Sequence, residues 1–200
     1  MRAALTKFDF RWTFLIALAS FVATAFFLRG ASTVDHLIAE RGPTLGGQFW
    51  RLFTGPLVHA TWGHLARDLA LLMFVGIVFE RELGRRWWLA CGAGLSVPTL
   101  ASFLADKNLE GFLGTSGLTH TLLGLVLVYV LRWERDADPW MRRAALVGAV
   151  LLAVKVTYEM IANAPMFPMD LGANVHQLPV AHFSGAIVGA LIGVARTTDP

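Results

Sequence analysis

Charged side chains are scarce in this sequence of 200 residues. Asp, Glu, Lys and Arg make up only 16% of it, while apolar residues make up 56%. Soluble domains carry about 25% charged residues. The shortage excludes an ordinary soluble domain and indicates a protein whose surroundings are a lipid bilayer.

Cysteine is almost absent too. Cys91 is the single cysteine, which excludes a disulfide within the chain, and it lies in an apolar run. We interpret it as a small core residue rather than a metal ligand or a nucleophile. The His-Glu-x-x-His motif of zinc hydrolases is also missing, and we expect neither a metal nor a cofactor. No repeat or low-complexity linker divides the chain, so we predict a single domain over residues 1–200.

Long apolar runs take the place of charge. A membrane-spanning helix needs about 20 mostly apolar residues. We predict an all-α membrane protein with six such spans: Trp12–Leu28, about His64–Phe79, Trp87–Ala105, the run between Glu110 and Arg132, about Ala144–Ala162, and about Val180–Ala195. The first could be a signal peptide, but no small-x-small cleavage site precedes a soluble domain, which favours an uncleaved span.

Two of the predicted spans contain ionisable residues. The second contains Arg67 and Asp68, and the fifth contains Lys155 and Glu159. Such groups are costly at membrane depth, so we expect them to face the protein interior or a water-filled cavity. Lys155 and Glu159 stand one helical turn apart and could form a purely structural ion pair; a functional role is the alternative.

Basic residues gather on one side of the predicted topology. With six spans both termini lie on the same side, and eleven Lys and Arg residues fall there, against four on the other side. The eleven are Arg2, Lys7, Arg11, Arg81, Arg85, Arg86, Arg132, Arg135, Arg142, Arg143 and Arg196; the four are Arg29, Arg41, Arg51 and Lys107. Because cytoplasmic loops carry the excess of Lys and Arg, we predict that both termini are cytoplasmic. The net charge of +3 then reflects topology, and no nucleic-acid partner is expected.

A serine flanked by glycines opens the fourth predicted span, in Gly114-Thr115-Ser116-Gly117. The glycines allow close backbone approach and leave the hydroxyl exposed. Free N–H groups at the start of a helix are the donors that an oxyanion needs. Taken alone, however, such a motif is more typical of helix packing.

A histidine precedes three spaced glycines in the sixth predicted span. His182 lies three residues before Gly185, and Gly189 and Gly193 follow at four-residue intervals, so all four share one helix face. The glycines predict close packing against another helix. His182 would project into that contact, where it could act as a general base beside a serine.

His59, His64 and Asp68 lie at the start of the second predicted span. His64 and Asp68 stand one turn apart and could hydrogen-bond a developing oxyanion, bind a metal or simply hold each other. Two ligands without a third make a poor metal site.

In their order and topology, these residues resemble the rhomboid family of intramembrane serine proteases. The resemblance covers a core of about residues 50–195 and rests on Gln48-Phe49-Trp50-Arg51-Leu52-Phe53-Thr54, His59, His64, Ser116 and His182. It implies that Ser116 is the nucleophile, His182 its base and His64 part of the oxyanion hole. It also implies cleavage of a peptide bond in or beside the transmembrane segment of a single-span membrane protein.

Asp68 departs from the family pattern, which usually has Asn at this position. A carboxylate at about 4 Å would oppose the oxyanion by about 4 kcal/mol at an effective dielectric constant near 20. We therefore expect Asp68 to be protonated, neutralised by Arg67 or Lys155, or turned away from the site.

A narrower resemblance is to the rhombosortase branch. That branch carries a second histidine one turn after the serine, as in Gly114-Thr115-Ser116-Gly117-Leu118-Thr119-His120, and Lys155-Val156-Thr157-Tyr158-Glu159 is also similar to it. The resemblance implies that the substrates are exported proteins with a C-terminal sorting tail: a Gly-Gly motif, a hydrophobic span and basic residues. His120 could tune the site or replace His182 as base, but a helix-packing hydrogen bond is the simpler reading.

Two other functions fit parts of the sequence. A catalytically inactive rhomboid-like protein would bind transmembrane helices without cutting them, but such relatives usually lack the serine or the histidine. A small proton-coupled transporter could use His64, Asp68, Lys155 and Glu159 as a relay, but it leaves the serine motif unexplained. We therefore predict a six-transmembrane-helix, rhomboid-like serine endopeptidase in a bacterial-type inner membrane, with its active site open to the periplasmic side.

Overall fold

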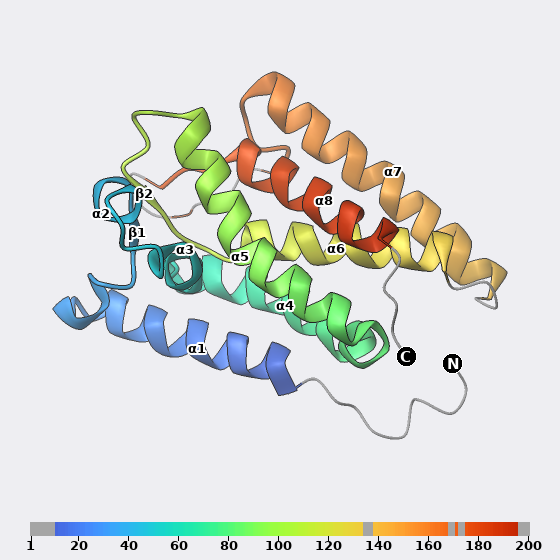
Figure 1. Ribbon diagram of the computed structural model, residues 1–200, viewed down its shortest axis with the longest axis horizontal. Helices are drawn as coiled ribbons and strands as arrows, with labels where there is room; N and C mark the ends of the chain where they lie inside the picture. Colours follow the sequence, from blue (N-terminus) through green and yellow to red (C-terminus); the bar gives the residue numbers. More distant parts are fainter. Residues whose placement is uncertain (1–10, 134–137, 168–170, 172–174, 196–200) are drawn as a thin grey trace.

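The fold is a bundle of long helices, described in a computed structural model for residues 11–133, 138–167, 171 and 175–195. Within these ranges six long helices run between two ends of the molecule, and the short elements gather at one end (Figure 1). The six are α1 (Arg11–Leu28), α4 (Trp62–Leu83), α5 (Arg85–Ala105), α6 (Ser116–Arg132), α7 (Pro139–Ala162) and α8 (Pro179–Val194). Each overlaps one predicted span, so the prediction of a helical architecture is confirmed.

The lengths of the helices bear on the number of spans. In the described part of the chain, α1, α4, α5 and α7 are long and apolar enough to cross a membrane. The apolar helices α6 and α8 have 17 and 16 residues. At 1.5 Å per residue each extends about 25 Å, just short of a hydrocarbon core of about 30 Å. The helices indicate a multi-pass membrane protein, and the count of six spans stays a prediction.

Local sequence explains where the site-bearing helices begin and end. At the start of α4, Thr61 Oγ1 accepts the backbone N–H of His64 at 3.1 Å. At the start of α7, Pro139 follows Asp138, whose carboxylate accepts the N–H of Trp140 at 2.8 Å. Both arrangements satisfy N–H groups that a helix start leaves free. Asn163, in the left-handed conformation that favours helix termination, ends α7.

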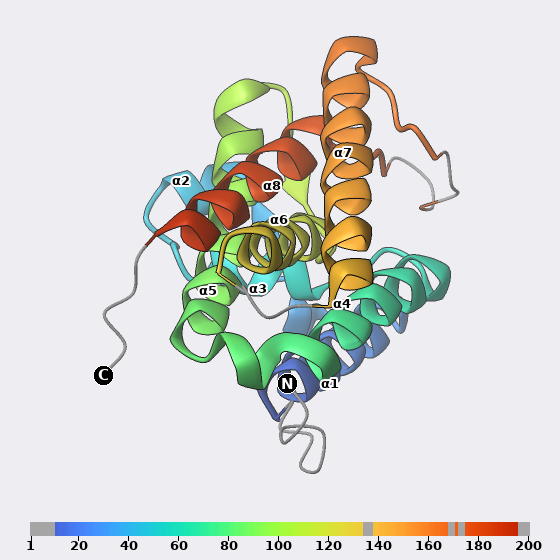
Figure 2. The same cartoon turned by 90° about the vertical axis from the view of Figure 1, so that its right-hand side faces the viewer.

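Helix α6 lies at the centre of the bundle. Figure 2 shows it end-on, surrounded by α4, α5, α7 and α8, while α1 lies outside against α4. Leu118, Leu122 and Leu125 of α6 are at most 1% exposed and form part of the main apolar core. Side chains at the first turn of α6 are therefore enclosed by four neighbouring helices.

Glycines bring α8 into backbone contact with α6. A Cβ atom at Gly185 would collide with the carbonyl of Gly117, and one at Gly189 with the carbonyl of Thr121. Only glycine permits this approach, which allows van der Waals packing between helices in a bilayer. The contact fixes the position of His182, one turn before Gly185, relative to the start of α6.

The distribution of polarity suits a lipid environment. Large apolar side chains face outward, among them Phe14, Phe21, Leu151 and Val154, each at least 50% exposed. Polar groups are enclosed instead: Glu80 of α4 is buried and accepts the backbone N–H groups of Trp12 and Thr13 at 3.0 and 2.9 Å. That contact ties the beginning of α1 to α4, because these N–H groups have no partner within their own helix.

Short elements form a layer over one end of the bundle. They are η1 (Ser32–Val34), β1 (Ala39–Glu40), α2 (Arg41–Leu45), α3 (Arg51–Thr54), η2 (Gly55–Leu57) and β2 (Gly111–Phe112). The two strands pair antiparallel, with Ala39 opposite Phe112. Arg51 is buried and donates to the carbonyl oxygens of Asp35 and Ile38 at 2.7 and 2.6 Å. These bonds hold the short elements to one another, and the pairing of β1 with β2 ties them to the segment that leads into Ser116.

Candidate active site

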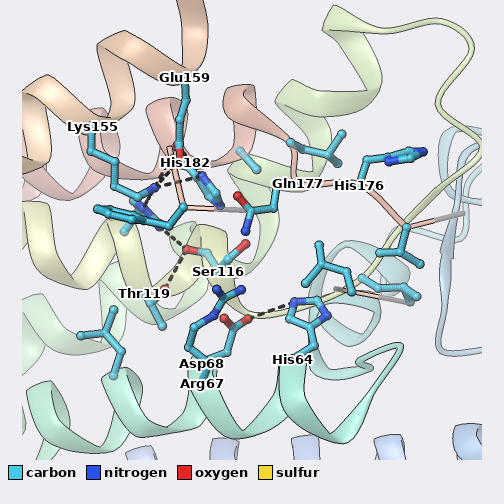
Figure 3. A pocket seen from close by; sticks show the side chains of 18 of the residues that line it. His64, Arg67, Asp68, Ser116, Thr119, Lys155, Glu159, His176, Gln177 and His182 are labelled. Carbon is cyan, nitrogen blue, oxygen red and sulfur yellow. Dashed lines mark hydrogen bonds and ion pairs between the residues drawn. The ribbon is translucent and has the colours of Figure 1, made fainter. Parts of the chain in front are cut away.

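A cavity of about 370 Å³ opens between α4, α6, α7 and α8. Its lining includes residues near the starts of α4, α6 and α8 and near the end of α7. These helix ends lie on the side of the short elements (Figure 1). Ser116, His182, His64 and Asp68, all singled out from the sequence, line it together (Figure 3). His120 lines it as well. Gly114 and Gly117 adjoin them in the chain, and Gly185 and Gly189 lie in the contact between α6 and α8.

The backbone before Ser116 passes directly against His64. Gly114 has a φ of +93°, and a Cβ atom there would lie 2.6 Å from Cε1 and Nε2 of the His64 ring. Its N–H donates to the carbonyl of Val58 at 2.8 Å. Glycine is needed at this position for both its positive φ and this close approach. The arrangement sets the first turn of α6, which begins at Ser116, beside the first turn of α4.

His182 has a carboxylate partner that we did not predict. Its Nδ1 atom lies 2.8 Å from Oε2 of Glu159, and the side chains are only 5% and 1% exposed. The sequence places Glu159 one turn from Lys155, and that ion pair is present, with Lys155 Nζ 2.9 Å from both carboxylate oxygens. The contact with His182 joins two helices and residues 23 positions apart, so periodicity within α7 gave no signal for it.

His120 lies beside His182 and links Ser116 to Lys155. The two imidazole rings are stacked, with centroids 4.1 Å apart and planes 12° apart. His120 Nδ1 lies 2.7 Å from the carbonyl oxygen of Ser116, and its Nε2 lies 3.0 Å from Lys155 Nζ. A proton on Nδ1 therefore lets His120 donate to the carbonyl and accept from the ammonium. This geometry commits both ring nitrogens and leaves neither for the Ser116 hydroxyl.

Asp68 lies in a buried cluster with two histidines. Its Oδ2 atom is 3.4 Å from His59 Nε2, 3.5 Å from His64 Nε2 and 3.4 Å from Thr115 Oγ1. Among the described residues its polar contacts are with these three, rather than with Arg67 or Lys155. The carboxylate thus stands directly behind the serine motif and beside the predicted oxyanion residue His64.

The three potential ligand atoms of this cluster also satisfy the spacing of a cation site. His59 Nε2, His64 Nε2 and a carboxylate oxygen of Asp68 all lie within 4.8 Å of one another. From the sequence only two ligands were expected here, because His59 lies outside the one-turn spacing that joins His64 to Asp68. However, the N–H of Thr115 donates to His59 Nε2 at 3.3 Å, which occupies the lone pair that a metal would need. A metal at this position would have to displace this hydrogen bond, so the three residues do not need a metal to explain why they lie together.

The sequence was also compared with models of protein families. The model of the rhomboid domain matches residues 46–198, which begins in the layer of short elements and extends past the end of α8. The match takes in the whole cavity lining and leaves α1 outside.

Proposed function

This chain belongs to the rhomboid family, and we propose that it is an intramembrane serine endopeptidase with Ser116 as nucleophile and His182 as general base. Members of the family are serine-type intramembrane proteases that act on transmembrane substrates. The observation that carries the proposal is the shared cavity, which Ser116 and His182 line from two helices in backbone contact.

The proposed reaction proceeds through an acyl-enzyme. Ser116 Oγ attacks the scissile carbonyl carbon while its proton passes to Nε2 of His182, and a carbon–oxygen bond forms. His182 then gives this proton to the leaving amine as the carbon–nitrogen bond breaks. Water attacks the resulting ester, His182 takes up its proton, and the serine hydroxyl is restored as the carboxyl product leaves.

The developing oxyanion needs donors that are already in place. The first N–H groups of α6 have no acceptor within the helix, and His64 lines the same cavity. These groups are the oxyanion hole of the proposal. Asp68 competes with the oxyanion for the His64 ring, because Oδ2 of Asp68 lies 3.5 Å from Nε2 of His64.

We assign the substrates to the class that the rhombosortase branch is proposed to cut. They are exported proteins whose C-terminal tail carries a Gly-Gly motif, a hydrophobic span and basic residues. His120 in the serine motif and the Lys155–Glu159 pair support this assignment, because these residues carry the resemblance and all three line the cavity. The proposed location is a bacterial-type inner membrane with cytoplasmic termini and a periplasmic opening of the site.

Labelling with a fluorophosphonate probe tests the catalytic proposal. We expect the purified wild type to be labelled and both Ser116→Ala and His182→Ala to lose labelling. Two matched variants serve as controls: Ser184→Ala removes a hydroxyl that donates to the Val180 carbonyl of its own helix, and His176→Ala removes an exposed histidine of the cavity lining. If the folded wild type neither reacts with the probe nor cleaves a model transmembrane substrate, the proposal is wrong, and the alternative is a non-catalytic protein that binds transmembrane helices.

A reporter protein tests the substrate class. Fused to a tail with the three sorting elements, it should be cut near the Gly-Gly motif by the wild type and left intact by Ser116→Ala. Replacing Gly-Gly with Val-Val should prevent cleavage while leaving the span unchanged. Equal cleavage of the Val-Val tail would contradict the sorting-tail assignment without affecting the serine mechanism.

A further inference from the structure

We propose that Glu159 is a positioning residue for the reaction: it holds His182 in the orientation and tautomer that can accept the Ser116 proton. This inference rests on the proposed function, in which His182 is the base. Figure 3 shows Glu159 reaching from α7 to the His182 ring, and Oε2 lies 2.8 Å from Nδ1. At 1% exposure, no bulk water competes with His182 for this carboxylate.

The short distance determines where the imidazole proton resides. A carboxylate oxygen only accepts, so a bare nitrogen lone pair at 2.8 Å would repel it. This contact is shorter than the 3.4 Å between Nδ1 and Lys155 Nζ, and we therefore place the hydrogen on Nδ1. In the neutral ring, the acceptor is then Nε2, the atom that takes the serine proton in the proposed reaction. When His182 becomes an imidazolium, the adjacent carboxylate stabilises the new charge.

Glu159 is itself held rigidly, as a positioning residue must be. Lys155 Nζ donates to both of its oxygens at 2.9 Å, and the backbone N–H of Met166 donates to Oε1 at 3.2 Å. Oε1 therefore faces Lys155 and Met166, while Oε2 is shared by Lys155 and His182. The carboxylate cannot rotate without losing several of these bonds.

The same lysine ties Glu159 to the nucleophile. Lys155 Nζ lies 3.0 Å from His120 Nε2, and His120 Nδ1 lies 2.7 Å from the carbonyl oxygen of Ser116. A continuous chain thus runs from the serine backbone through His120, Lys155 and Glu159 to the base. Helix α7 contributes neither nucleophile nor base, yet two of its residues set the positions of both.

If Lys155 and Glu159 formed only a structural ion pair, Glu159 would not need His182 as a further partner. Lys155 and Glu159 stand at positions i and i+4 and already satisfy each other within one helix. The bond to His182 is as short as those to Lys155, and it is made by a residue that lines the cavity. The contact therefore has the geometry of a base and the carboxylate that orients it.

Kinetics of Glu159→Gln and Glu159→Asp test this inference. Gln keeps the size of the side chain and an oxygen for Lys155 and Met166. Its amide N–H, however, would favour the opposite His182 tautomer; the corresponding change in soluble serine proteases lowers kcat about 10⁴-fold. We expect Glu159→Gln to lower kcat at least about 100-fold with KM and Tm near those of the wild type, and Glu159→Asp to regain at least about tenfold. Glu82→Gln, at an exposed position on α4, is the matched control and should be unchanged.

Two results would overturn the inference. One is a Glu159→Gln variant with wild-type kcat; the other is a loss that Asp does not relieve and that is accompanied by a lower Tm and a raised KM, as a structural role predicts. Ser116→Ala is measured in parallel. If it is inactive while Glu159→Gln is fully active, only this inference fails; if Ser116→Ala still cleaves, the proposed function fails together with it.

Discussion

At the scale of single residues, Asp68 is where the site departs most from what oxyanion chemistry requires. Its carboxylate lies 3.5 Å from His64 Nε2 and 3.4 Å from Thr115 Oγ1. The negative charge attracts the His64 N–H away from the substrate and opposes an oxyanion formed beside Ser116. Asn at this position would keep an oxygen for both partners and remove the charge.

We expect Asp68→Asn to cleave a transmembrane substrate at least as fast as the wild type. A gain of up to about tenfold corresponds to about 1.4 kcal/mol of transition-state stabilisation. Asp68→Ala, by contrast, removes a buried acceptor, and should cost about 1–3 kcal/mol of stability. Initial cleavage rates and melting curves of the two variants give the comparison. A folded but inactive Asp68→Asn would mean that the site requires the carboxylate charge.

From the sequence, residues of interest could be singled out where the informative neighbours are close in the chain, and the catalytic roles given to them stay predictions. The Gly114–Gly117 motif and the glycines after His182 indicated Ser116 and His182, and both line one cavity. The sequence did not reveal that Glu159 contacts His182 or that His59 contacts Asp68. Each of those contacts joins separate elements, and a 3.6-residue periodicity describes only one helix at a time.

At the scale of elements, the contact between α6 and α8 determines whether the nucleophile and the base meet. Gly189 has no room for a Cβ atom against the Thr121 carbonyl, whereas a Cβ atom at Gly92 of α5 would meet nothing within 4 Å. We expect Gly189→Ala to lower the stability by about 1–3 kcal/mol, which corresponds to a Tm lower by about 5 °C, with loss of labelling. Gly92→Ala should leave both unchanged or raise Tm slightly. A Gly189→Ala variant with wild-type Tm and labelling would contradict the role given to this contact.

The long helices were predictable because apolar length is a strong signal, and all six were located from it. The layer of short elements lies mostly between the first and second predicted spans, where the sequence indicated no structure. It depends on long-range bonds such as those from Arg51 to the carbonyls of Asp35 and Ile38, which no local pattern encodes. The predicted boundaries of α4 fell short at both ends. At the C-terminal end Glu80 and Arg81 follow Phe79, so hydropathy falls before the helix ends at Leu83.

At the scale of the whole molecule, the orientation in the membrane rests on the distribution of basic residues. Arg85 and Asn108 lie at opposite ends of α5, and both are exposed. In a Cys91→Ala background, we expect a membrane-impermeant maleimide added to spheroplasts to label Asn108→Cys and not Arg85→Cys. The reverse pattern would invert the topology, and labelling of both would mean that α5 does not cross the bilayer.

The ion pair contained within α7 also bears on biosynthesis. Lys155 and Glu159 are synthesised before α8, so the Glu159 carboxylate enters the bilayer before its partner His182 has been made. A lone carboxylate in a nascent span would be costly to insert. With its counter-ion one turn away, the part of α7 that follows Arg143 can enter the bilayer without a net charge before α8 is made. The lysine would thus serve the insertion of α7 as well as the finished site.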